Sequence, residues 1–188
     1  KTIISAQQMT VLPGAGINLD EYPYVPMKDD GVCSFLFVGR IMKEKGVDEF
    51  FAAAKTIKAE FGEKVAFDVV GFYEDAYKET VDQLVADGVI KFHGFQTDVH
   101  PFYEAADCVV LPSYHEGMSN VLLEGAATGR ALITSDIPGC REAVEDGVVL
   151  PPDEFTPFLL YIAPDQIQIT DDPLTTLSFE ITVTTAPA

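Results

Sequence analysis

Apolar residues follow two different periods along the chain, and each period predicts one type of element. Short, continuous apolar runs are typical of strands that are buried on both faces of a parallel sheet. Such runs lie at residues 33–38 and 108–111, and we expect further strands at 65–70, 89–92 and 131–134. Between them, apolar residues recur at helical spacing with charged residues on the other face. This spacing predicts helices over residues 47–61, 76–86, 99–106 and 120–127, and a further short helix that begins at Glu142.

Strand and helix alternate at least five times in this pattern. Such alternation predicts an α/β fold, in which helices flank both faces of a parallel sheet. Ligands of these sheets bind outside the carboxyl ends of the strands. The residues that directly follow each predicted strand are therefore the candidates for a site, namely Gly39-Arg40, Gly71-Phe72, Gly94-Phe95, Ser113 to Asn120 and Ser135-Asp136.

The two ends of the chain differ in character from its middle. Residues 1–30 hold one short apolar run at 9–12, followed by prolines and glycines, which indicates a last strand and then a linker. Residues 142–188 contain no Lys or Arg, and Leu177 to Thr184 alternate with period two, as a half-exposed antiparallel strand does. We therefore expect three parts: 1–30, the end of a preceding domain and a linker; 31–150, the α/β domain; and 151–188, a strand-rich tail of unknown role.

The charge of the chain excludes one class of partner. The 188 residues include 12 Lys or Arg and 30 Asp or Glu, for a net charge of -18. A field of this sign repels nucleic acids and anionic lipid surfaces, so we expect no nucleic-acid partner. Any anion would have to bind at a local basic spot.

The cysteines and histidines predict no metal site. Cys33, Cys108 and Cys140 are far apart and lie in or beside apolar runs, so we expect buried free thiols in a reducing, cytoplasmic compartment. Neither they nor the three histidines have the spacing of zinc ligands, and no Asp-x-Asp pair occurs. No signal peptide or membrane span is recognisable. The first residue is Lys1, so we expect that the natural start lies upstream.

Two segments after predicted strands have the chemistry of anion sites. Gly39, Arg40, Lys45 and Gly46 lie between the first buried strand and its helix, where two cations and a helix N-terminus attract an anion. The alternative is a solvated loop with exposed cations. In the second segment, Ser119 and Asn120 are good N-cap residues. The backbone N–H groups before that helix, at Gly117, Met118 and Ser119, would then form a second cradle for an anion.

Two glutamates frame the second segment. Glu116 would repel a phosphate, so it should face hydroxyls or a developing positive charge, and Glu124 follows about one helical turn after the start of the helix. A carboxylate accepts two hydroxyl hydrogen bonds well, and a ribose offers a vicinal pair. The alternatives are a helix-dipole partner for Glu116 and an ordinary surface residue for Glu124. We expect structural rather than catalytic roles for His93 and His100.

Together these segments resemble the C-terminal half of a retaining glycosyltransferase of family 4 (group 1), which has the GT-B fold. The resemblance is carried by LPGAGINLDEY, VGRIMKEKG, DVVG and FHGFQTDVHPFYEAADCVVLPSYHEGMSNVLLEGAATGRALITSDIPGCREAVEDG. It covers about Val11 to Val148, roughly three quarters of the chain. It implies a Rossmann-like domain that forms one half of the GT-B fold and binds a nucleotide sugar without a metal or another cofactor.

The resemblance also implies a role for each candidate residue. Arg40 and Lys45, after Gly39, would hold the diphosphate and stabilise the leaving nucleotide. Glu116 would contact the donor sugar near the reacting carbon, so that Glu116, Arg40 and Lys45 form the catalytic set, and Glu124 would hold the ribose hydroxyls. The backbone around Phe95 would face the base. The phosphate and the sugar hydroxyls would meet the start of the helix at Gly117, Met118, Ser119, Asn120 and Val121.

Two departures from the family shape the expected function. The N-terminal domain of the GT-B fold is missing, and the family pattern stops near Val148. We therefore expect a donor-binding domain of a hexosyl-type transferase that makes a polysaccharide or glycoconjugate and is inactive alone, with the full-length protein in the cytoplasm or at the membrane face. Two alternatives stay open. One is a non-catalytic assembly module that self-associates through the tail, and the other is a sugar-nucleotide epimerase.

Overall fold

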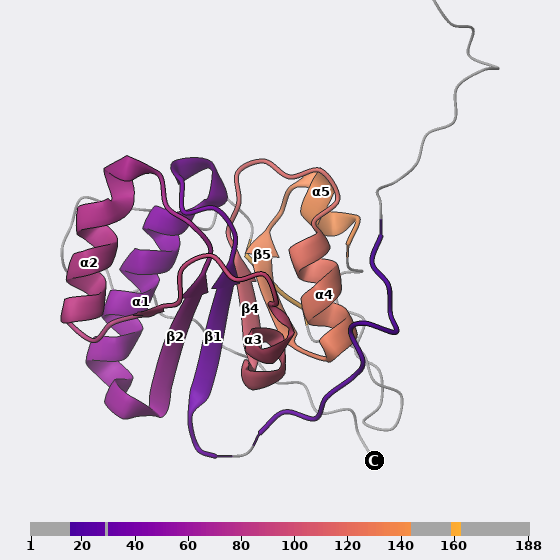
Figure 1. Cartoon of the computed structure of the whole chain (residues 1–188), viewed down its shortest axis with the longest axis horizontal. Coiled ribbons are helices and arrows are strands. Elements are labelled where there is room, and N and C mark those ends of the chain that lie inside the picture. Colours follow the sequence, from indigo (N-terminus) through magenta and orange to yellow (C-terminus); the bar gives the residue numbers. More distant parts are fainter. Residues whose placement is uncertain (1–15, 29, 144–158, 163–188) are drawn as a thin grey trace, which may run out of the picture.

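A parallel sheet of six strands forms the centre of the structure, a computed structural model that describes residues 16–28, 30–143 and 159–162. The strands are β1 (Cys33–Val38), β2 (Val65–Val70), β3 (Lys91–Phe92), β4 (Cys108–Leu111), β5 (Ala131–Ser135) and β6 (Leu159–Ile162). Their order is β3-β2-β1-β4-β5-β6, and every neighbouring pair is parallel. The predicted α/β fold with a parallel sheet is confirmed (Figure 1).

Helices cover the two faces of this sheet (Figure 1). One face packs against α1 (Val47–Phe61) and α2 (Lys78–Ala86), and the other against α3 (His100–Ala105), α4 (Asn120–Thr128) and α5 (Pro138–Arg141). Three single turns of 3-10 helix complete the described elements: η2 (Lys43–Lys45), η3 (Gly62–Lys64) and η4 (Asp75–Tyr77).

Strand β1 contributes to both hydrophobic cores because successive side chains of a strand point to opposite faces. Phe37 packs in the core under α1 and α2, whereas Leu36 and Val38 pack in the core under α3 and α4. This explains why the run reads as continuously apolar in the sequence. Both neighbours of β1 are parallel to it, so the three strands end at the same edge of the sheet.

Several predicted bounds and one predicted environment were wrong. Strand β3 is shorter than predicted because the backbone N–H groups of Val89 and Ile90 donate to the Leu84 carbonyl at the end of α2. The last predicted helix begins at Pro138, whose fixed φ suits a first helical turn, and Glu142 caps its end. Cys108 and Cys140 are buried as expected, but Cys33 is exposed because it opens β1 at the amino-terminal edge of the sheet.

The sheet continues beyond residue 150 in the described residues. Strand β6 pairs with β5 in parallel, from Leu132↔Leu159 to Ser135↔Ile162. The predicted strands at 9–12 and at 177–184 lie outside the described residues. The division into three parts at residues 30 and 150 therefore stays a prediction.

The segment of residues 16–28 runs along the α4 side of the molecule to the start of β1 (Figure 1). A fully buried arginine, Arg130, attaches it there. The guanidinium donates to the carbonyls of Val25, Ala106 and Thr128, and the Val25 N–H donates to the Thr128 carbonyl at 3.2 Å. The pattern analysis did not identify Arg130, because nothing in its sequence surroundings signals a buried cation.

Candidate functional site

The loops that follow β1, β2 and β4 meet at the carboxyl-terminal edge of the sheet, and backbone contacts hold them together. The Ile41 N–H donates to the Phe72 carbonyl at 2.9 Å, and the Tyr114 N–H donates to the Glu44 carbonyl at 2.9 Å. Gly46, with φ +68°, packs directly against Pro112, since a Cβ at this position would overlap the Pro112 carbonyl oxygen. The two predicted segments therefore belong to one candidate site.

The centre of this site is a salt bridge between two predicted site residues. Lys45, the last residue of η2, places its Nζ 2.6 Å from Oε1 of Glu116. The hydroxyl of Ser113, which is fully buried, donates to the same oxygen at 2.7 Å. The Glu116 side chain is 12% exposed and that of Lys45 is 28% exposed, so the pair is only partly accessible to solvent. Two donors thus fix one carboxylate oxygen of Glu116 and leave Oε2 for another partner.

The sequence analysis placed Lys45 and Glu116 in separate segments and gave no role to Ser113. In the sequence, only its position could have pointed to Ser113: it follows Pro112, directly after the apolar run that forms β4. Because Ser113 is buried, its hydroxyl needs a hydrogen-bond partner, and Glu116 of the same segment supplies it. The tertiary structure therefore adds Ser113 to the candidate site as the second donor to Glu116.

Helix α4 begins beside this cluster, as predicted. Ser119 is the N-cap residue, and its hydroxyl accepts a hydrogen bond from the Leu122 N–H at 3.4 Å. The first turn of α5 packs on this segment, because a Cβ on Gly139 would lie 2.7 Å from the Glu116 carbonyl carbon and overlap the Gly117 carbonyl oxygen. This packing fixes the backbone that leads into α4.

The expected cradle of three backbone N–H groups is smaller than predicted. The Ser119 N–H donates to the Gly139 carbonyl at 3.2 Å, so it is already engaged. The N–H groups of Gly117 and Met118 donate to no other atom of the described residues. Asn120 is exposed at the first position of α4, and Val121 packs partly into the core under α3 and α4. Two N–H groups and a helix N-terminus therefore remain available to an anion.

Glu124 lies in the second turn of α4 and is partly buried. Its Oε2 accepts a hydrogen bond of 2.7 Å from the hydroxyl of Tyr103, a fully buried residue of α3. Burial, and then the charge and hydrogen bond of Glu124, raise the pKa of Tyr103 well above its ordinary value. A partly buried carboxylate that accepts this hydrogen bond is not an ordinary surface residue, which was the alternative for Glu124.

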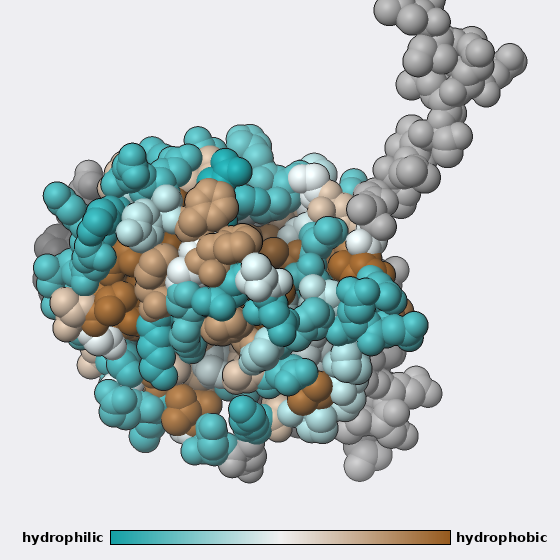
Figure 2. Space-filling model, viewed as in Figure 1, coloured by the Kyte–Doolittle hydropathy of each residue, from teal (hydrophilic) through white to brown (hydrophobic). Residues whose placement is uncertain are grey.

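The remaining predicted residues lie along the same edge of the sheet. Arg40 is exposed, and its guanidinium carbon stands 5.4 Å from the centre of the Phe72 ring, in cation–π geometry. Phe72 and Phe95, which follow β2 and β3, are 51% and 68% exposed. Figure 2 shows hydrophobic residues gathered over the ends of β1 and β2, on a face that is otherwise largely hydrophilic. An exposed aromatic surface beside a cation suits a planar, anionic ligand.

The two histidines that the sequence analysis considered structural are both paired with a carboxylate. Nε2 of His93 lies 2.6 Å from Oδ1 of Asp68, and Nδ1 of His100 lies 2.7 Å from Oδ1 of Asp98. In residues 16–28, 30–143 and 159–162, no three His, Cys, Asp or Glu side chains gather as a metal site requires. None of the helices formed by these residues is long and apolar enough to cross a membrane.

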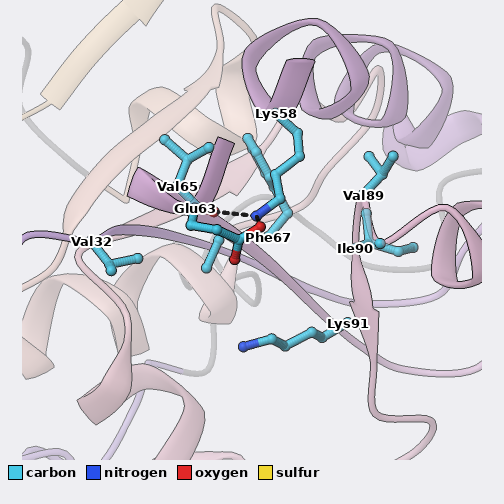
Figure 3. A pocket seen from close by; sticks show the side chains of 10 residues that line it. Val32, Lys58, Glu63, Val65, Phe67, Val89, Ile90 and Lys91 are labelled. Atoms are coloured by element: carbon cyan, nitrogen blue, oxygen red, sulfur yellow. Dashed lines mark hydrogen bonds and ion pairs between the residues drawn. The ribbon is translucent and has the colours of Figure 1, made fainter. Parts of the chain in front are cut away.

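A cavity of about 170 Å³ lies at the opposite, amino-terminal edge of the sheet, among the first residues of β2 and β3 (Figure 3). Lys58 points into it, but its Nζ already donates to the Val65 carbonyl at 3.0 Å and lies 3.5 Å from Oε1 of Glu63. Lys91 extends along another side of the cavity (Figure 3). Lys58 is thus already paired in this cavity, which lies at the edge of the sheet opposite the cluster around Lys45.

Comparison with known proteins agrees with this architecture. Residues 33–162 match the family described as Glycosyl transferases group 1. A Campylobacter jejuni relative, N,N'-diacetylbacillosaminyl-diphospho-undecaprenol alpha-1,3-N-acetylgalactosaminyltransferase, is 30% identical over 130 residues, which make up 69% of this chain and 31% of the relative. The chain therefore spans about a third of the length of that curated relative.

Two solved structures share the fold at low sequence identity. HepE of Anabaena, crystallised in complex with UDP and glucose, is 22% identical with a TM-score of 0.59, and the match covers 80% of this chain and 43% of that one. The C-terminal domain of LpcC, a glycosyl transferase group 1 family protein of Francisella tularensis, is 22% identical with a TM-score of 0.56. That match covers 78% of this chain and 80% of that domain. With the family match over most of its α/β core, the chain belongs to the glycosyl transferases group 1 family.

Proposed function

We propose that this chain is the donor-binding, C-terminal domain of a retaining, nucleotide-sugar-dependent glycosyltransferase. The observation that carries the proposal is the meeting of Lys45, Glu116 and the N-terminus of α4 at the carboxyl edge of the sheet. Ligands of parallel α/β sheets bind at this edge. The match to an isolated C-terminal domain of a family member, over most of both chains, supports the same assignment.

The geometry supports a diphosphate beside Lys45. An ammonium group has three donors, and the salt bridge to Glu116 uses one of them. Lys45 can therefore keep Glu116 in place and still donate to a phosphate oxygen, with Arg40 and the N–H groups of Gly117 and Met118 as further donors. The net charge of -18 does not prevent this, because charges beyond about 8 Å are largely screened at physiological salt.

The proposed chemistry is electrostatic. As the bond between the sugar and the nucleoside diphosphate breaks, negative charge grows on the leaving phosphate, and preorganised donors lower the barrier by neutralising it. Arg40, Lys45 and the helix N-terminus supply these donors. Glu116, with Oε1 fixed and Oε2 open, faces the donor sugar near the reacting carbon, where positive charge develops. No residue in this scheme needs a metal ion.

The other parts of the site bind the remaining groups of the donor. The ribose hydroxyls bind Glu124, and the base lies against the backbone around Phe95, with the sugar hydroxyls at Ser119, Asn120 and Val121. The acceptor site belongs to an N-terminal domain that the proposed enzyme has and this chain does not include. We therefore propose that the chain alone binds the donor but does not transfer sugar efficiently, and that the complete enzyme builds a glycoconjugate or polysaccharide, as the name of the Campylobacter relative indicates for that protein.

Calorimetric titration of the 188-residue chain with UDP, GDP and ADP tests this function. One of them should bind, and Arg40→Met and Lys45→Met should each weaken it by roughly 10-fold or more, since a hydrogen bond to a charged group contributes about 1.5–3 kcal/mol. Lys64→Met is the matched control, because Lys64 is exposed at the end of η3, directly before β2 and thus at the opposite edge of the sheet, and its replacement removes the same charge. Failure of all three nucleotides to bind, or equal affinities in the three variants, would refute the assignment.

A further inference from the structure

Two tyrosines from different segments converge on the carboxylate of Glu124. Tyr103 of α3 donates its hydroxyl to Oε2 at 2.7 Å. Tyr22, in the segment before β1, packs edge-on against Tyr103, with ring centres 6.1 Å apart and planes at 79°. The other contact of its ring is a stack on His100, at 4.3 Å and 30°. The phenol of Tyr22 is thereby held toward the same carboxylate, which contributes, after burial, to raising the pKa of Tyr22.

A simpler explanation for one of these contacts is that a buried phenol needs an acceptor. This accounts for Tyr103, which is fully buried, but not for Tyr22, which is only partly buried and can donate to water. Two phenols on one carboxylate restrict the rotamers of a side chain that otherwise loses about 1.5–2 kcal/mol of conformational entropy when it is fixed. An acceptor that is fixed before its ligand arrives binds that ligand more tightly.

The carboxylate keeps acceptor capacity despite these two donors. An ionised carboxylate has about four lone-pair sites on its two oxygens, so two phenols leave sites for a vicinal pair of hydroxyls. Both phenols also stay protonated at neutral pH. Burial, and then Glu124, raise the pKa of Tyr22 to about 12, and the same two causes hold the pKa of Tyr103 well above its ordinary value. Both tyrosines therefore act as donors throughout the physiological range.

We propose that Tyr22 and Tyr103 are positioning residues, which hold Glu124 in the orientation that accepts the ribose hydroxyls of the donor nucleotide. The inference rests on the proposed function, because it takes Glu124 as the ribose acceptor. It makes the segment of residues 16–28 a working part of the donor site, since Tyr22 lies in that segment, and not only a connection to the upstream chain.

The test is a double-mutant cycle that combines a change in the protein with a change in the ligand, with affinities measured by calorimetry on the 188-residue chain. The ligands are the nucleoside diphosphate that binds the wild type and its dideoxyribose counterpart, which lacks both ribose hydroxyls. Tyr22→Phe and Tyr103→Phe should each lower the affinity for the nucleoside diphosphate with intact ribose, the ribose ligand, by about 3- to 10-fold, which is the effect of one neutral hydrogen bond. Neither change should affect the dideoxyribose ligand. Tyr77→Phe is the matched control, because its hydroxyl donates to Asp48 at 3.2 Å on the α1 side of the sheet.

Each other outcome overturns the inference in a recognisable way. If Tyr22→Phe and Tyr103→Phe weaken both ligands equally, the tyrosines only support the fold. If Glu124→Gln weakens the ribose ligand and the tyrosine variants do not, Glu124 binds ribose without them, and the proposed function survives alone. If the wild type binds no nucleoside diphosphate, the proposed function fails and this inference fails with it. Tyr22 is only partly buried, so Tyr22→Phe carries the test even if Tyr103→Phe does not fold.

Discussion

Replacing Gly46 by alanine is expected to disturb the contact on which the Lys45–Glu116 salt bridge depends. Gly46 has φ +68°, and an added Cβ would lie 2.6 Å from the carbonyl carbon of Pro112 and closer still to its oxygen. Carbon atoms pack at about 3.5 Å or more, so one of the two loops has to move by about 1 Å. The loop that moves carries either Lys45 or Glu116.

The size of the effect follows from two contributions. A left-handed backbone conformation costs an alanine roughly 1–2 kcal/mol. Forcing an extra carbon into a packed contact adds about 1–3 kcal/mol. We therefore expect Gly46→Ala to lower the free energy of unfolding by about 2–5 kcal/mol. Gly88→Ala separates the two contributions, because Gly88 has the same φ of +68° but no atom within 4 Å of its added Cβ, so it should lose only about 1–2 kcal/mol.

Urea unfolding of the wild type and both variants, followed by circular dichroism, measures these differences. Calorimetric titration with the nucleoside diphosphate that binds the wild type then reports on the site. Gly46→Ala should bind this ligand more weakly, whereas Gly88→Ala should keep the wild-type affinity. Equal stabilities and equal affinities in the two variants would show that the loops after β1 and β4 do not touch as described.

Three further predictions concern other side chains of the protein. Arg130→Met should lower the free energy of unfolding by about 3 kcal/mol or more, because the acceptors of Arg130 lose their donor and each unsatisfied buried carbonyl costs about 1–3 kcal/mol; a loss below about 1 kcal/mol in urea unfolding would contradict this. Ser113→Ala should weaken the binding of the nucleotide sugar by about 3- to 10-fold and leave the binding of the nucleoside diphosphate unchanged, because it removes a hydrogen bond to Glu116 alone. Equal effects on the affinities for both ligands would contradict this role of Ser113. The pKa values of Tyr22 and Tyr77 are raised to about 12, chiefly by burial, so the folded chain keeps protons that the unfolded chain releases near pH 10. Stability should therefore be complete below about pH 10 and fall as the pH rises toward 12, and full ionisation of all tyrosines near pH 10 in the folded chain, seen as tyrosinate absorbance, would refute the shift.

Much of the fold could be predicted from the sequence because the period of burial is a local property. A strand buried on both faces is apolar at most of its positions, which located β1, β2 and β4. Strand–helix alternation then required a parallel sheet, whose carboxyl ends lie at one edge. That geometry placed Arg40, Lys45 and Glu116 at this edge before any contact was known, although the role of each remains a proposal.

Errors in the predicted elements have equally local causes. The period of α5 is too short to detect in four residues, and only Pro138 marked its start. Cys33 belongs to an apolar run, but a strand that begins at the surface leaves its first residue exposed. The N-cap at Ser119 was predicted correctly, since the cap chemistry depends only on neighbours within the first turn.

The sequence by itself thus determined the type of sheet, the edge at which the candidate site lies and the kinds of residue found there. Only the tertiary structure decided which of them touch. Lys45 and Glu116 are 71 residues apart and form one salt bridge because the backbones at Gly46 and Pro112 are in contact. Glu124 is oriented by Tyr103 from another helix. Periodicity reports which face of an element is buried, but a hydrogen bond depends on distances between loops, and the packing of the whole domain sets those distances.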